Sequence, residues 1–250
     1  MIYLKRKIDD FLVSWKENPD RKPLIVKGPR QVGKTESINR FGNQSYSSVI
    51  YINFVEEPKY KMITGDSYKA ADIIKNISRI DPSKKFIEGE TLIFFDELQE
   101  FPEIATALKF FKIDGRFDVI CSGSMLGINY RKIESNSVGY KTDYEMFSMD
   151  FEEFLWAMGD EVTTSFIRKC FEKKMPLGQG AHRKVMNSFR QYLLVGGMPQ
   201  SVLAYMNGKD FEASDTAKRN ILRLYRDDVA KFADGYEDKV FAVFDGIPGQ

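Results

Sequence analysis

Histidine and cysteine are scarce in this sequence, which limits the metal and disulfide chemistry that it can support. His182 is the one histidine among 250 residues, and Cys121 and Cys170 are the two cysteines. A structural zinc site needs about four ligands of such types, so we do not expect one. Two distant cysteines do not make a disulfide framework, and reduced cysteines suit the cytosol.

An excess of charge of one sign is lacking too, and so are long apolar runs. The 37 basic and 36 acidic residues give a net charge of +1, which does not favour DNA as a partner, although a neutral total can hide a local patch. No stretch approaches the ~20 apolar residues that span a bilayer. The charged N-terminus, MIYLKRKIDDFLVSWKENPD, is unlike a signal peptide. We therefore expect a cytoplasmic protein with no membrane partner.

Short apolar runs alternate with helical patterns in the first part of the chain. The expected strands are 24–26, 49–54, 92–95, 117–121 and 144–149. The expected helices are 2–18, 34–40 with Gly42 as its end, 66–80 and 104–111. This alternation predicts right-handed βαβ units around a parallel sheet with helices on both faces.

The pattern becomes almost wholly helical at Asp150. Asp150 and Glu153 have the spacing of a capping box, and Gly159 is expected to end the helix that they open. Further helices are expected at 161–175, 181–194 and 211–233, with a turn at 196–199. We therefore divide the chain into a core of residues 1–149 and a helical domain of residues 150–250.

A phosphate-binding motif follows the first expected strand. Eight residues match GxxxxGK[ST]: Gly28, Pro29, Arg30, Gln31, Val32, Gly33, Lys34 and Thr35. Glycines let backbone N–H groups turn toward an anion, and the next helix adds its positive N-terminal end. Lys34 is expected to reach the β and γ phosphates and Thr35 to ligate Mg²⁺. The alternative is a glycine-rich turn with a surface lysine.

Two acids follow the third expected strand, LIFF at 92–95. Ligands of parallel sheets lie at the carboxyl ends of the strands. We therefore expect Asp96 to hold Mg²⁺, often through a water molecule, and Glu97 to orient and deprotonate the attacking water. Acids that follow a strand can also form a plain solvated turn.

A further group of polar residues follows the fourth expected strand. Ser122 is our first choice, and Ser124 the second, for a contact with the γ phosphate or the attacking water; a plain Ser-Gly turn is the alternative. Arg30 either assists with phosphate or pairs with an acid. NTPases often meet transition-state charge with an arginine. The candidates are Arg168, Arg183, Arg190, Arg219, Arg223 and Arg226, each of which can equally be a surface ion-pair residue.

Several segments occur together in an order that resembles one prokaryotic family. They are GPRQVGKT, TLIFFDELQE, CSGS, MFSMDFEEFLWAMG, YLLVGGMPQSV and LYRDDVAKFA. The chain resembles AAA-like P-loop ATPases whose C-terminal half is a domain of unknown function. This resemblance implies an ASCE-type core with an additional strand, a helical or winged-helix lid, and Glu97 as the base. It also implies that a part similar to restriction endonucleases would begin about where this chain stops, so we expect a truncated lid.

The sequence therefore predicts an α/β protein, a P-loop NTPase with a lid domain, that binds ATP and Mg²⁺ and hydrolyses ATP to drive work on an unknown protein partner. ATP rather than GTP follows from the resemblance, and no NKxD-type guanine motif occurs. A homo-oligomer is left open. The alternatives are a nucleotide-dependent switch with little turnover and a DNA-associated factor.

Overall fold

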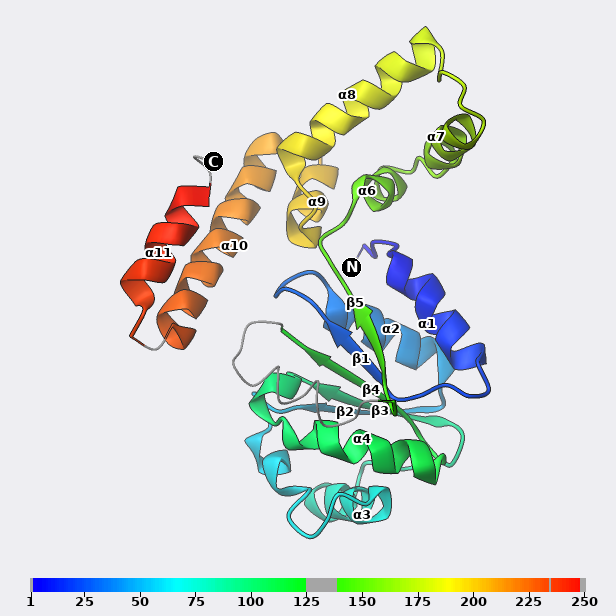
Figure 1. The fold of residues 1–250 in the computed structure, drawn as a ribbon, viewed down its shortest axis with the longest axis vertical. Helices are drawn as coiled ribbons and strands as arrows, with labels where there is room; N and C mark the ends of the chain where they lie inside the picture. Colours follow the sequence, from blue (N-terminus) through cyan, green and yellow to red (C-terminus); the bar gives the residue numbers. More distant parts are fainter. Residues whose placement is uncertain (1, 125–138, 234, 248–250) are drawn as a thin grey trace. The chain divides into compact units, whose positions relative to one another are not determined.

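The chain forms two compact units. The computed structural model describes residues 2–124, 139–233 and 235–247 (Figure 1). One unit, the core unit, consists of residues 6–147, and the other, the helical unit, consists of residues 2–5 and 148–247. The division lies at 147/148, and the first residues of the chain belong with the helical unit.

A parallel sheet forms the centre of the core unit. Its strands are β1 (Leu24–Lys27), β2 (Ser48–Asn53), β3 (Thr91–Asp96), β4 (Asp118–Gly123) and β5 (Thr142–Glu145), in the spatial order β2-β3-β4-β1-β5. Strand β4 lies between β1, which precedes the GxxxxGK[ST] motif, and β3, which ends at Asp96. Because all strands are parallel, their carboxyl ends meet at one edge.

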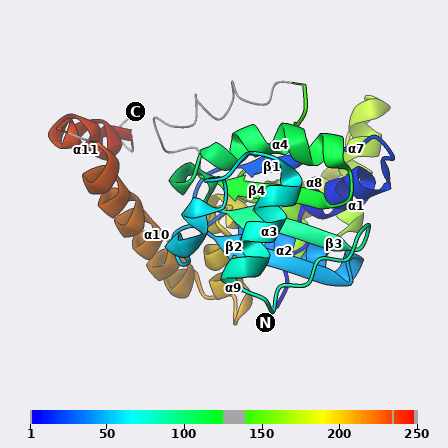
Figure 2. The same ribbon diagram turned by 90° about the horizontal axis from the view of Figure 1, so that it is seen from below.

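Helices cover both faces of this sheet. They are α1 (Lys7–Glu17), α2 (Lys34–Ser45), α3 (Ala70–Ile80) and α4 (Glu103–Asp114), with 3₁₀ turns η1 (Pro58–Met62) and η2 (Leu98–Glu100). Side chains of α3 and α4 pack with Ile93 and Phe95 in one apolar cluster. Neighbouring strand residues point to opposite faces, and α2 lies against Leu92 on the other face (Figures 1 and 2). The α/β arrangement predicted from the alternation is confirmed.

Gly42 does not end its helix as expected, because α2 continues through it to Ser45. A Cβ atom at Gly42 would lie 3.0 Å from side-chain atoms of both Leu92 and Val49. The glycine therefore allows the helix to approach the sheet closely. Two other helices begin later than expected, α1 at Lys7 and α3 at Ala70.

The fifth strand is Thr142–Glu145 and not 144–149. Its pairing with β1 is bounded by hydrogen bonds from the Thr142 N–H to the Pro23 carbonyl (2.9 Å) and from the Met146 N–H to the Lys27 carbonyl (2.7 Å). Thr142, Asp143 and Glu145 are polar, as an edge strand allows. A search for apolar runs therefore places this strand too late.

The described part of the helical unit contains helices and no strand. They are α6 (Phe151–Ala157), α7 (Val162–Glu172), α8 (Gln179–Val195), α9 (Pro199–Met206), α10 (Phe211–Phe232) and α11 (Glu237–Gly246). The Asp150–Glu153 capping box is confirmed, with hydrogen bonds of 2.9 and 3.2 Å. The sequence predicts either a helical or a winged-helix domain here, and the described residues agree with the helical form. None of the described helices has the length and apolar character that a membrane crossing requires.

The helical unit has its own apolar core. Met149, Phe154, Val202 and Tyr205 are buried together, and Leu4 packs with them. Helices α9 and α11 were not expected. Helix α9 begins at Pro199, although the sequence predicts a turn at 196–199; proline is also favoured in the first turn of a helix, where no N–H is needed.

Candidate functional site

The P-loop connects β1 to α2 and depends on two glycines. Gly28 has φ +156°, and a Cβ atom there would lie 2.0 Å from the carbonyl oxygen of Met146. Gly33 has φ +96° and is the N-cap of α2. A side chain at Gly28 would therefore push the loop away from the end of β5, and one at Gly33 would strain the start of the helix.

Lys34 is buried at the start of α2 and is turned back into the loop. Its Nζ donates hydrogen bonds to the carbonyl oxygens of Gly28 (2.8 Å) and Pro29 (2.7 Å). Burial lowers the pKa of Lys34, and the negative charges of Glu97 and Asp96 oppose that effect. Both acceptors are neutral carbonyls, so an anion in the loop would offer this ammonium a stronger partner.

Asp96 is buried at the carboxyl end of β3 and accepts hydrogen bonds from several elements. Its Oδ2 accepts from the Thr35 hydroxyl (2.8 Å) and the Tyr51 hydroxyl (3.2 Å). Its Oδ1 accepts from the Ser122 hydroxyl and from the Glu97 N–H (2.9 Å). The structure thus brings together Thr35 and Asp96, the two residues expected to hold Mg²⁺.

Glu97 follows Asp96 in the left-handed region of backbone conformation, with φ 58° and ψ 48°. This conformation is costly for a residue other than glycine. It turns the chain out of β3 into η2, where the Glu100 N–H donates to the Glu97 carbonyl (2.9 Å). The Glu97 carboxylate accepts a hydrogen bond from the Gln99 side chain. The two neighbouring acids therefore have separate partners.

Ser122 is the fifth residue of β4, and Ser124 directly follows the strand. The Ser122 hydroxyl is fully buried and donates to Asp96, so in this structure it positions a carboxylate. The Ser124 backbone N–H donates to the Gln99 side-chain oxygen (3.2 Å). The expected contact of one of these serines with the γ phosphate or the attacking water stays a prediction.

Three residues at the site were not anticipated: Tyr51, Gln99 and Arg6. Burial raises the pKa of Tyr51 to about 12, so its phenol stays protonated and donates to Asp96. Arg6 donates to the carbonyls of Val32 in the P-loop (2.6 Å) and Phe147 (2.8 Å). A polar residue near the end of β2, beside β3, is a usable sequence signal for Tyr51, whereas no spacing points to Arg6.

The arginines considered for transition-state charge all belong to the helical unit. Arg168 pairs with Glu152 (3.0 Å), Arg219 with Asp215 (2.8 Å) and Arg226 with Asp245. Arg190 donates to Asn187 (3.1 Å). These contacts fit the surface ion-pair alternative for the first three residues.

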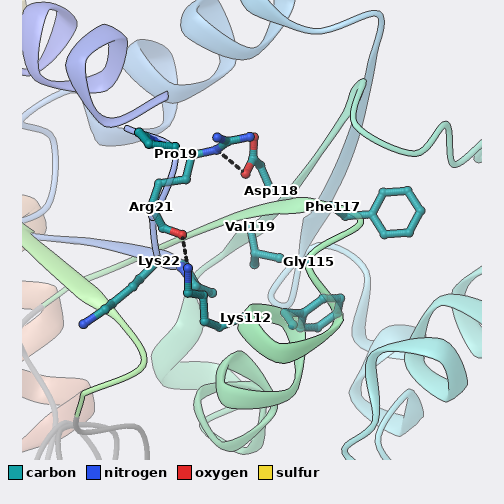
Figure 3. A pocket seen from close by; sticks show the side chains of 10 residues that line it. Pro19, Arg21, Lys22, Lys112, Gly115, Phe117, Asp118 and Val119 are labelled. Atoms are coloured by element: carbon teal, nitrogen blue, oxygen red, sulfur yellow. Dashed lines mark hydrogen bonds and ion pairs between the residues drawn. The ribbon is translucent and has the colours of Figure 1, made fainter. Parts of the chain in front are cut away.

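A cavity of about 130 Å³ lies at the edge of the sheet where β1 and β4 begin, opposite the edge with Asp96 (Figure 3). Arg21 pairs there with Asp118 (2.6 Å), whose other oxygen accepts from the Tyr46 hydroxyl (2.8 Å). Lys112 pairs with Asp20 (2.7 Å). Because these cations are matched by acids, the contacts support a structural role for the cluster.

We expect Asp118→Asn to lower the free energy of unfolding by about 1–2 kcal/mol, between the values of exposed and buried ion pairs. The Asp118 side chain is 13% exposed, so its loss leaves the Arg21 guanidinium poorly matched. Urea denaturation measures the change. Asp20→Asn is the control, since Asp20 is 82% exposed and should leave the midpoint nearly unchanged. Equal midpoints for both variants would contradict the prediction.

Comparisons with known proteins agree with the motifs. A family model described as an AAA domain matches residues 20–155, and one described as a domain of unknown function (DUF8612) matches residues 186–250. No curated protein matches the chain.

Three solved structures are similar at low identity. C. elegans PCH-2 is 10% identical, with 86% of this chain and 68% of that chain covered and a TM-score of 0.43. AMPPCP-bound DnaA from Aquifex aeolicus is 14% identical, with 94% and 70% covered and a TM-score of 0.44. Drosophila ORC bound to DNA is 13% identical, with 86% and 66% covered and a TM-score of 0.43.

The family match and the site geometry concern the same residues. The AAA domain match includes the P-loop, the Asp96–Glu97 pair and Ser122, and it extends over more than half of the chain. The matched region also contains all five strands of the sheet. Together these findings support nucleotide binding, and the chain belongs to the AAA domain family.

Proposed function

We propose that this chain binds ATP with Mg²⁺ and hydrolyses ATP. The observation that carries the proposal is the 2.8 Å contact between the Thr35 hydroxyl and the Asp96 carboxylate. That contact joins the end of the phosphate-binding loop to the end of β3. Lys34 lies one residue before Thr35, held by two neutral carbonyls.

The chemistry of this donor set fits Mg²⁺. The ion prefers oxygen ligands and keeps several waters, and Thr35 and Asp96 supply a hydroxyl and a carboxylate beside the loop. Asp96 is 3% exposed, so its charge is poorly screened by solvent. When bound, Mg²⁺ would neutralise charge on the β and γ phosphates.

The residues of the chain divide the work of hydrolysis. The P-loop N–H groups and Lys34 bind and orient the phosphates. Ser122 and Tyr51 hold Asp96 in place through their hydroxyls. Glu97 accepts the proton of the attacking water at its carboxylate, and that water displaces ADP from the γ phosphorus in line.

The proposal also covers the two domains and the partner of the chain. Residues 150–250 act as a helical lid over a core of residues 1–149, and ATP turnover drives work on a protein partner. The net charge of +1 does not favour DNA as that partner. Phosphate release by the wild-type chain with Mg²⁺, against the same reaction with a chelator, tests the proposal directly. ATP binding without phosphate release would favour a nucleotide-dependent switch.

We expect Asp96→Asn to reduce the gain in ATP affinity on adding Mg²⁺ by roughly tenfold, because the carboxylate charge is lost while the size is kept. Titration of a fluorescent ATP analogue with and without Mg²⁺ measures this. Asp143→Asn is the control, since Asp143 is an exposed strand aspartate paired with Lys141. A full Mg²⁺ effect in Asp96→Asn would remove Asp96 from the metal site.

A further inference from the structure

We propose that Gln99 is a positioning residue for Glu97, and that it links the Glu97 carboxylate to the end of β4. This inference rests on the proposed function, because Glu97 is the base of the proposed hydrolysis. Gln99 lies in η2, two residues after Glu97, and is 8% exposed.

Both ends of the Gln99 amide are used. Its Nε2 donates to Oε2 of Glu97, and its Oε1 accepts from the backbone N–H of Ser124 at 3.2 Å. A carboxylate can only accept, whereas an amide offers a donor and an acceptor at once. Gln99 can therefore hold the Glu97 side chain on one side and the backbone after β4 on the other.

The Gln99 amide occupies space that a side chain at residue 123 would also need. A Cβ atom on Gly123 would lie 2.8 Å from Oε1 of Gln99 and 3.4 Å from Cβ of Leu98. Leu98 is 1% exposed and packs in the apolar cluster of the core unit, so η2 has little freedom to move away. Gly123 thus keeps the place of the Gln99 amide open.

These contacts close a ring that includes both acids. Asp96 accepts from Ser122, the chain runs from Ser122 to Ser124, and Ser124 donates to Gln99. Gln99 donates to Glu97, whose backbone N–H returns to Asp96 (2.9 Å). Gln99 is the side chain that completes the ring. It fixes one carboxylate oxygen of Glu97 and leaves the other to meet the attacking water.

The kinetic test uses Gln99→Met, which keeps the length and removes both polar ends. We expect kcat for ATP to fall roughly tenfold while KM and the affinity for an ATP analogue change less than twofold, because orientation of the base is lost and phosphate binding is kept. Gln99→Glu keeps an acceptor for the Ser124 N–H and loses the donor to Glu97. Its kcat should therefore also fall below that of the wild type. An unchanged or higher kcat in either variant would overturn the proposal.

Two double variants separate positioning from a general packing role. Adding Gln99→Met to Glu97→Gln should cause no further loss of kcat, since Gln99 acts through Glu97. Gly123→Ala alone should reproduce the Gln99→Met loss by displacing the amide, and combining the two should add little. Losses that multiply in both combinations would show that Gln99 only supports packing.

A measurement without nucleotide tests the linkage itself. In the ¹⁵N amide spectrum, Glu97→Ala should shift the Ser124 resonance in the chain with Gln99, and it should have no such effect in the Gln99→Met chain. An unshifted Ser124 resonance would refute the link between Glu97 and β4. If the wild-type chain turns over no faster than Glu97→Gln, the proposed function and the catalytic role of Gln99 both fail, and the amide spectrum still reports on the link.

Discussion

Replacement of Glu97 by glutamine should lower the ATP turnover by about a hundredfold or more, the usual span for loss of a general base. Glutamine keeps the size of the side chain and cannot accept the proton of the attacking water. Asp96 keeps its donors from Thr35, Tyr51 and Ser122, so the binding of ATP should be nearly unchanged. Steady-state phosphate release and titration with an ATP analogue measure the two quantities.

The control for this variant is Glu103→Gln, which changes an exposed glutamate at the start of α4. It should leave turnover unchanged. Equal turnover of the wild type and Glu97→Gln would contradict the assignment of Glu97 as the base. A large loss of ATP affinity in Glu97→Gln would point to a role in binding.

Lys34→Ala should weaken the binding of ATP at least about tenfold, because the variant loses the ammonium that the proposed function assigns to the β and γ phosphates. The nucleotide-free melting temperature should change little. Both of its hydrogen bonds go to carbonyls of the loop itself, and burial lowers the pKa of Lys34, so burial disfavours the charged form of this side chain. A fluorescent ATP analogue and thermal denaturation give the two readings.

Lys75→Ala serves as the matched variant, since Lys75 is an exposed lysine on α3 in the same unit. Its affinity for the analogue should equal that of the wild type. If a folded Lys34→Ala chain binds the analogue as tightly as the wild type, the P-loop does not bind the phosphates.

The sequence predicts the inner strands of the sheet because burial on both faces requires continuous apolar runs. All six residues of β3 are buried, and its apolar run is plain in the sequence. The edge strand β5 carries Thr142, Asp143 and Glu145, so the same rule misplaces it. The sequence predicts too short a helix at Gly42. A glycine that ends a helix and one that lets a helix pack closely on a sheet look alike in sequence.

Some residues of the candidate site can be predicted from local sequence motifs, and others cannot. The P-loop and the Asp96–Glu97 pair are contiguous motifs, and short-range spacing is enough to find them. Tyr51 contacts Asp96, which lies 45 positions later in the chain. Arg6 contacts Val32, which lies 26 positions later. Such contacts depend on strand register and on the path of the N-terminal segment, which a single sequence does not specify. Gln99 lay within a recognised segment, but its role becomes visible only through Ser124 on another strand.

The Asp96 carboxylate accepts four hydrogen bonds, two at each oxygen. A carboxylate has about four lone-pair sites, and Thr35, Tyr51, Ser122 and the Glu97 N–H occupy that number. A cation could bond directly to Asp96 only by displacing one of these donors. The Thr35 hydroxyl, in contrast, has one proton for Asp96 and two lone pairs left over. If Mg²⁺ binds as proposed, Thr35 would supply the ligand oxygen, and Asp96 would act through the Thr35 hydroxyl whose hydrogen bond it accepts.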